Sequence, residues 1–139
     1  MNNHSDIKIG DVFLIRFDGN RSEQRGLRPG IIFQNNVGNQ YSPNVVALPL
    51  TSSVKRTELP THVFLPAAET GLLRDSVVLC ENPRTVSKEE LGNYLTTIPS
   101  KYIGQIAVAN LLASSAISYV EPNTLLAAWQ KALVLNKKP

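Results

Sequence analysis

The sequence predicts a mainly β domain with helices near its C-terminal end, and three observations carry this prediction. Between residues 7 and 98, short apolar and β-branched runs recur at nearly regular spacing, split by glycine, proline and asparagine turns. From residue 100 onward, apolar residues recur every three or four positions, which is the period of an amphipathic helix. Strands followed by helices favour a compact β-barrel or sandwich over alternating βαβ units.

The expected strands cover residues 7–17, 30–34, 45–50, 61–65, 75–80 (extended to 85) and 94–98. In the first of them, Val12 to Ile15 is nearly continuous in apolar residues, as in a strand covered on both faces. Pro49 lacks an amide hydrogen, so it indicates an edge or bulged position near the end of the third strand. Ser87 is the expected N-cap of a short helix, and Ser100 that of a longer helix packed on the strands.

Size and composition bound the class of protein. A chain of 139 residues fits one domain, and 42% hydrophobic with 18% charged residues is typical of a folded globular protein. No apolar run approaches the roughly 20 residues that span a bilayer, and the first residues lack the features of a signal peptide. Because Cys80 stands alone, there is no disulfide framework, and a cytoplasmic location is expected.

Positive charge is concentrated in the long segment after the first strand. The net charge is +3, and Arg16, Arg21, Arg25 and Arg28 fall within thirteen positions. The segment from residue 18 to 28 is too long for a tight hairpin, which makes it a candidate functional loop. An ordinary solvated loop is the alternative, but the clustering favours a polyanionic partner such as nucleic acid.

The segment from Ser22 to Asn39 reads SEQRGLRPGIIFQNNVGN. It resembles the signature of the MazF/PemK toxin endoribonucleases, whose first long loop reads SEQ-x-G-x-RP before an apolar strand ending in QN. The stretches that match in register further on are TSS from Thr51, LPTHV from Leu59, GLLRDSVVLCENPRT from Gly71 and LG at Leu91. The resemblance covers roughly Ile7 to Val120. It implies a small SH3-like β-barrel with a C-terminal helix, a fold shared with the CcdB gyrase poisons.

This resemblance implies the toxin of a type II toxin–antitoxin system, acting as a metal-independent endoribonuclease on single-stranded mRNA. Attack by the 2′-hydroxyl would leave a 2′,3′-cyclic phosphate and a 5′-hydroxyl. The implied partners are the RNA, a cognate antitoxin and a second copy in a homodimer. The alternatives are a CcdB-like gyrase poison without nuclease activity and an inactive relative kept for partner binding. Gyrase poisons rely on a tryptophan near the chain end followed by Gly-Ile, whereas ten residues follow Trp129 here.

The resemblance assigns catalysis to Arg28 and Thr51. The family carries its catalytic arginine at this Arg-Pro, and a guanidinium has the fixed charge and fork geometry that suit a phosphate. We expect Arg28 to stabilise charge, because a group with a pKa above about 12 is a poor base. The family's catalytic threonine lies at Thr51, whose hydroxyl can donate to a phosphate oxygen; without the resemblance it would read as a threonine capping a strand.

Glu81 is the third candidate, as an acid or base or as a reader of a nucleotide edge. Some PemK-type members carry an acid here, with an arginine two residues earlier and a histidine in the first loop. This chain has Leu79 and Ser22 at those positions, so that acid–base pair is not intact. The residues expected to contact RNA are Ser22, Glu23, Gln24, Arg25, Asn35, Ser52 and Asn82.

Other chemistry-bearing residues are expected to be structural. His62 lies in the LPTHV strand, and Cys80 in an apolar run is expected to be buried. One cysteine and two distant histidines do not make a metal site, so neither a metal nor another cofactor is expected.

Residues 121–139 extend beyond the toxin-like domain of residues 1–120. We expect this segment to be a helical extension of the same domain, beginning near Pro122. Its apolar stripe consists of Leu125, Leu126, Trp129 and Leu133. The simpler expectation is a second helix packed onto the domain; the alternative is an added dimer or antitoxin surface.

Overall fold

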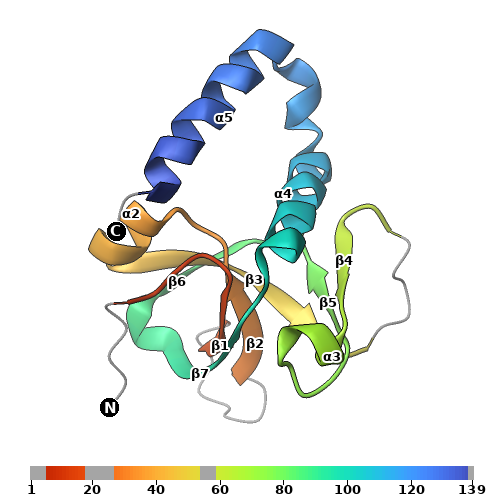
Figure 1. The fold of residues 1–139 in the computed structure, drawn as a ribbon. Coiled ribbons are helices and arrows are strands. Elements are labelled where there is room, and N and C mark those ends of the chain that lie inside the picture. Colours follow the sequence, from red (N-terminus) through yellow and green to blue (C-terminus); the bar gives the residue numbers. More distant parts are fainter. Residues whose placement is uncertain (1–5, 18–26, 54–58, 138–139) are drawn as a thin grey trace.

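The structure, a computed structural model, describes residues 6–17, 27–53 and 59–137 (Figure 1). The loop motif from Ser22 to Arg25 lies outside the described residues. Seven strands are described: β1 (Asp11–Arg16), β2 (Leu27–Ile32), β3 (Asn44–Thr51), β4 (His62–Leu65), β5 (Ser76–Leu79), β6 (Arg84–Ser87) and β7 (Leu91–Thr97).

All described strand pairs are antiparallel, and the strand order is β4-β5-β3-β2-β1-β7, with β6 paired to β3. The mainly β fold with C-terminal helices is therefore confirmed. A closed barrel is not: β4 and β7 end the path, and no pairing between them is found among the described strands. The sheet curls without its two end strands meeting.

Both faces of the curled sheet are buried, in two separate apolar clusters. Val12 belongs to one cluster, with Leu48 and Ile106, whereas its neighbour Phe13 belongs to the other, with Ile32. Because successive side chains of a strand point to opposite faces, a strand covered on both sides is apolar without alternation. The expectation for the first strand is confirmed.

Pro49 does not lie on an edge strand, so that part of the prediction is wrong. β3 is central: it pairs with β2 on one side and with β6 and then β5 on the other. Pairing with β6 ends at Ala47 and pairing with β5 begins at Leu50. Pro49 therefore falls between the end of the β6 pairing and the start of the β5 pairing. On that side of β3 no hydrogen bond of the sheet requires an amide hydrogen at Pro49.

The helical elements are α2 (Asn36–Tyr41), α3 (Ala67–Thr70), η1 (Lys88–Glu90), α4 (Ser100–Ser114), η2 (Ala116–Tyr119) and α5 (Pro122–Lys137). Ser87 caps η1 as expected, its hydroxyl accepting from the Glu89 amide at 3.1 Å. The N-cap of α4 is Pro99 rather than Ser100, because the helix already includes Ser100. α2 and α3 were not expected, since helices this short show no periodic pattern.

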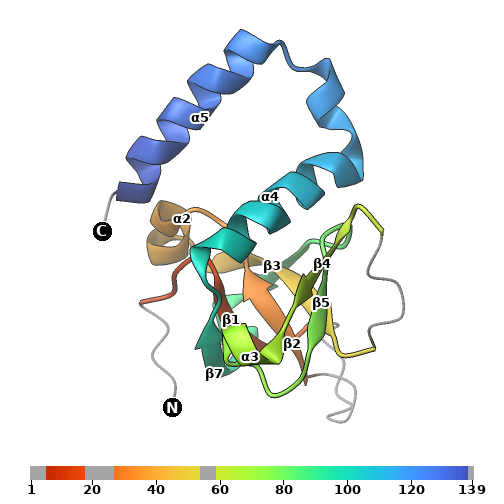
Figure 2. The same ribbon diagram turned by 45° about the vertical axis from the view of Figure 1, so that its right-hand side comes forward.

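α4 lies across the sheet and completes one core (Figure 2). Its buried residues Tyr102, Ile106 and Ala109 recur at four- and three-residue spacing, which places them on one face. Gly10 lets this helix approach the start of β1 closely. A Cβ at Gly10 would lie 2.5 Å from Ile103 Cδ1, and its φ of +93° is one that other residues rarely adopt.

α5 begins at Pro122 as expected, but the expectation that it packs onto the domain is wrong. Every residue from Glu121 to Asn136 is exposed, including Trp129 at 57%. Figures 1 and 2 show the chain leaving α4 through η2 and returning as α5, whose end lies beside α2. The face of α4 that could have held it, with Val108 and Leu112, is likewise exposed.

Truncation after Val120 is expected to leave the stability of the domain nearly unchanged. An exposed helix removes little apolar surface from water, so its loss costs about 0.5 kcal/mol or less, a shift of about 3 °C or less in the unfolding midpoint. Thermal unfolding of the truncated and full-length proteins, at several protein concentrations, measures the shift. A midpoint lowered by about 8 °C or more would show that α5 packs against the protein in solution.

Candidate active site

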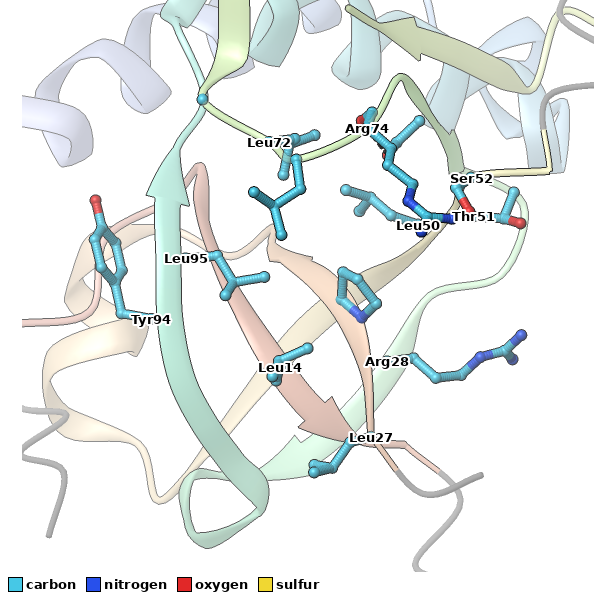
Figure 3. Close-up of a pocket in the computed structure, with 14 residues that line it drawn as sticks. Leu14, Leu27, Arg28, Leu50, Thr51, Ser52, Leu72, Arg74, Tyr94 and Leu95 are labelled. Atoms are coloured by element: carbon cyan, nitrogen blue, oxygen red, sulfur yellow. Dashed lines mark hydrogen bonds between the residues drawn. The ribbon is translucent and has the colours of Figure 1, made fainter. Parts of the chain in front are cut away.

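A cavity of about 680 Å³ opens beside the end of β3, within the size range of small-ligand sites (Figure 3). It lies between β2, β3, β7 and the segment that precedes β5. Its lining residues are Leu14, Leu27, Arg28, Pro29, Leu50, Thr51, Ser52, Gly71, Leu72, Leu73, Arg74, Ser76, Tyr94 and Leu95. Leucines form one part of the wall, and guanidinium and hydroxyl groups form another.

A second, much smaller cavity of about 50 Å³ adjoins the same residues. Arg28 and Thr51 line both cavities, and the smaller one adds Phe17, Asn82 and Arg84. The structure therefore brings the two predicted catalytic residues together and places Ser52 and Asn82 beside them.

Arg28 lies within β2 rather than in the loop where the sequence placed it. Its Cα pairs with Ile15 of β1, and Pro29 pairs with Leu14. The sequence alone does not show how far β2 extends to the N-terminal side of Pro29, because that depends on its pairing with β1. Its side chain is exposed, and Figure 3 shows it pointing away from the leucine-lined wall.

Thr51 ends β3, and its hydroxyl is oriented by the next turn. Its Oγ1 accepts a hydrogen bond from the Ser53 amide at 3.1 Å. A hydroxyl has one hydrogen and two acceptor lone pairs, so this bond leaves the hydrogen available for donation to a ligand. Thr51 is half-buried and lines the cavity, so this hydroxyl can donate to a ligand bound there.

Glu81 has an unexpected partner in His62. His62 Nε2 lies 3.3 Å from Glu81 Oε2, because β4 and β5 pair with His62 opposite Leu79. The sequence interpretation took His62 as structural, and only strand pairing reveals the contact. Neither residue lines the two cavities, but Glu81 directly precedes Asn82, whose Oδ1 accepts from Arg84 Nε at 3.2 Å.

The remaining predicted contacts divide into two groups. Ser22, Glu23, Gln24 and Arg25 lie outside the described residues. Asn35 is described but is not brought to the cavities: its Oδ1 accepts from the Gly38 amide at 2.8 Å and caps α2.

Arg74 and Arg84 are the charged cavity residues that the sequence interpretation did not single out. Both lie inside the matched stretch GLLRDSVVLCENPRT, Arg74 directly before DSVVL and Arg84 in the RT pair. Their place in that matched stretch was the sequence signal that could have identified them as site residues.

Glu69 and Cys80 lie away from both cavities and have shifted pKa values. Lys101 lies 3.3 Å from Glu69, and the pKa of the Glu69 carboxyl is lowered by hydrogen bonds from the Tyr102 hydroxyl and then from Lys101. Cys80 is fully buried as expected, and burial raises the pKa of its thiol to about 12. It is therefore a neutral core residue at physiological pH and not a nucleophile.

Within residues 6–17, 27–53 and 59–137, no three His, Cys, Asp or Glu side chains are grouped so that they could hold a metal ion. None of the helices in these ranges is long and apolar enough to cross a membrane.

Two arginines and four hydroxyl-bearing residues, Thr51, Ser52, Ser76 and Tyr94, line this cavity, and guanidinium and hydroxyl donors suit the oxygens of a phosphodiester. The fold and the site fit the class of phosphodiester-binding proteins, which includes nucleases. The sequence model of the PemK-like, MazF-like toxins of type II toxin–antitoxin systems matches residues 8–112, and the chain belongs to this family.

Named relatives and solved structures agree with this assignment. The chain is 32% identical over 114 residues to endoribonuclease EndoA of Bacillus subtilis, covering 81% of this chain and 98% of that protein. It is 38% identical over 101 residues to endoribonuclease MazF of Staphylococcus saprophyticus, covering 72% and 84%. A mycobacterial endoribonuclease superposes with a TM-score of 0.66 at 27% identity, covering 83% and 94%.

Another solved structure contains a mycobacterial endoribonuclease in complex with its cognate antitoxin. It superposes with a TM-score of 0.65 at 28% identity, covering 78% of this chain and 95% of that one. The family resemblance read from the sequence is confirmed, and the gyrase-poison alternative is not supported. The family match ends at residue 112, before α5 begins.

Proposed function

We propose that this toxin is a metal-independent endoribonuclease that cleaves single-stranded mRNA at a short sequence. The observation that carries the proposal is that Arg28 and Thr51 line the same cavity. The relatives named above are endoribonucleases, which supports the same reaction class.

Without a metal, the nucleophile comes from the RNA itself. The 2′-oxygen forms a bond to the adjacent phosphorus, and the bond from phosphorus to the 5′-oxygen breaks. The products are a 2′,3′-cyclic phosphate and a 5′-hydroxyl, so a proton leaves the 2′-hydroxyl and one is delivered to the 5′-oxygen.

Arg28 and Thr51 stabilise the charge that builds on the phosphoryl oxygens. The guanidinium keeps its charge throughout, and the Thr51 hydroxyl, which accepts from the Ser53 amide, still has its hydrogen to donate to a phosphoryl oxygen. Glu81 is the carboxylate we assign to proton transfer or to reading a base edge, with His62 holding its position. Ser52 and Asn82 contact RNA from the cavity walls, and we retain Ser22 to Arg25 and Asn35 as proposed RNA contacts.

We further propose that the curled sheet is the SH3-like barrel of these toxins, and that the protein acts in the cytoplasm as a homodimer silenced by a cognate antitoxin. The antitoxin complex of the mycobacterial relative supports the last point. Exposed Leu27, Leu73, Tyr94 and Leu95 beside the cavity provide apolar area for a second copy.

The test is cleavage of single-stranded RNA by purified protein in excess EDTA. We expect cutting to continue in EDTA and to leave 5′-hydroxyl ends, whose sequencing also gives the recognition sequence. A single 2′-deoxynucleotide placed 5′ to the scissile phosphate should abolish cutting while binding persists, because the nucleophile is missing. The same sequence in a duplex should be spared, since its base edges are stacked.

Three results would contradict the proposal. Loss of activity in EDTA would point to a metal. Cutting of the deoxy-substituted strand would make water the nucleophile. An absence of cleavage of any RNA, together with binding to gyrase, would favour the gyrase-poison function.

Truncation after Val120 is expected to retain cleavage. Complete loss of cleavage by a folded truncated protein would show that α5 is required for activity.

A further inference from the structure

We propose that Arg74 is a second phosphate-binding arginine of this site, gripping the RNA backbone together with Arg28. This inference rests on the proposed function. Both residues line the 680 Å³ cavity together with Thr51 and Ser52. They come from different elements, Arg28 from β2 and Arg74 from the segment that joins α3 to β5.

The direction of the Arg74 side chain carries the first part of the argument. Figure 3 shows it extending from its segment toward Thr51 and Ser52 at the end of β3. A phosphate that accepts from the Thr51 hydroxyl therefore lies within the region that the Arg74 fork faces. Arg28 lines the same cavity from β2, so two guanidinium groups border it.

The Arg74 guanidinium forms no ion pair with another described residue. Among the residues that the structure describes, the close contacts between basic and acidic side chains are Lys101–Glu69 and His62–Glu81, and neither involves Arg28 or Arg74. The neighbouring Asp75 forms no ion pair with Arg74; its Oδ1 accepts from the Ala67 amide at 2.8 Å. A guanidinium that lines a cavity without such an ion pair is available to an anionic ligand.

The segment that carries Arg74 is fixed at both ends. At its start, Gly71 ends α3 with a φ of +80°, and a Cβ there would lie 2.7 Å from Thr96 Oγ1. Thr96 Oγ1 in turn donates to the Thr70 carbonyl at 2.8 Å. At its end, Ser76 Oγ donates to the Arg74 carbonyl at 3.0 Å.

These bonds use main-chain atoms of the segment and leave the Arg74 side chain free to bind. The side chain is therefore presented from a set position, which lowers the entropy cost of binding a phosphate. The same arrangement means that removing the side chain leaves the supporting bonds in place, so an effect of Arg74→Ala on RNA is not an effect on folding.

Phosphate binding predicts a particular salt dependence. The logarithm of the RNA association constant falls linearly with the logarithm of the salt concentration. For a single strand, removing one phosphate-binding cation makes this negative slope shallower by about 0.7. Arg74→Ala should therefore weaken RNA binding about 10-fold at about 0.1 M salt and reduce the slope by about 0.7. Arg74→Lys keeps the charge but removes the fork, so it should restore the slope and only part of the affinity.

The experiment measures binding of a labelled single-stranded RNA at several salt concentrations. The probe carries the mapped cleavage sequence with a 2′-deoxynucleotide before the scissile phosphate; if the wild-type protein cuts nothing, random-sequence RNA of the same length replaces it. Lys131→Ala is the matched control, because it removes one exposed charge from α5 and Lys131 lines neither cavity. This control should bind within about twofold of wild type, and all variants should share one unfolding midpoint.

The outcomes separate the two proposals. If Arg74→Ala binds RNA with the affinity and slope of Lys131→Ala, the role of Arg74 is wrong and the nuclease proposal stands. If Arg74→Lys behaves like Arg74→Ala in slope, a charge-based role is also excluded. If the wild-type protein binds RNA without cutting it and Arg74→Ala still lowers the slope, the phosphate contact holds and the proposed activity fails. A wild-type protein that neither binds nor cuts RNA would overturn both.

Discussion

Replacing Arg28 by alanine is expected to lower the rate of RNA cleavage by at least roughly 100- to 1,000-fold, with little change in stability. Removal of one preorganised donor to a developing charge costs about 3–4 kcal/mol in the transition state. Arg28 is exposed and lines both cavities, so the removed group acts on the ligand and not on packing. Single-turnover cleavage at saturating enzyme measures the chemical step.

Thr51→Ala should have a smaller effect than Arg28→Ala, because a neutral hydroxyl contributes less than a charged donor. Thr51→Ser is the matched control, since it keeps the hydroxyl and should recover most of the rate. Arg25→Ala, from the loop outside the described residues, should mainly weaken binding and lower its salt dependence. If Arg25→Ala abolished turnover while Arg28→Ala spared it, the alignment of the RP motif with the catalytic arginine would be wrong.

Ile106→Ala is expected to lower the free energy of unfolding by about 2–5 kcal/mol, the range for truncating a buried aliphatic side chain. Ile106 is fully buried and joins α4 to the core that contains Leu48 and Val78. The cavity left behind would loosen the only described long helix packed on the sheet. Urea unfolding, with equal m-values required for the comparison, gives the difference.

Val108→Ala on the same helix is the matched control. Val108 is 58% exposed, so its truncation should change the free energy of unfolding by about 0.5 kcal/mol or less. Equal decreases for Ile106→Ala and Val108→Ala would mean that α4 does not hold the sheet through the face described here.

The amino-acid sequence was sufficient to predict most of the strands, the late helices and the family, although it ran β5 and β6 together as one extended segment. Apolar runs such as that of Val12 to Ile15 reflect burial on both faces, which is a local requirement of each strand. The RP and TS motifs singled out Arg28 and Thr51, and the structure places both on one cavity. Ser87 was predictable as a cap, since a cap is recognised by its immediate neighbours.

Which residues meet depended on the tertiary structure. His62 and Glu81 are 19 positions apart and meet because β4 pairs with β5, and Arg74 reaches the cavity because the segment before β5 lies beside the end of β3. Pro49 is tolerated in a central strand because its two partners on one side meet there. Periodicity shows that a face is apolar but not what covers it. The stripe containing Trp129 therefore predicted a helix correctly, while its exposure was set by the path of the chain after α4.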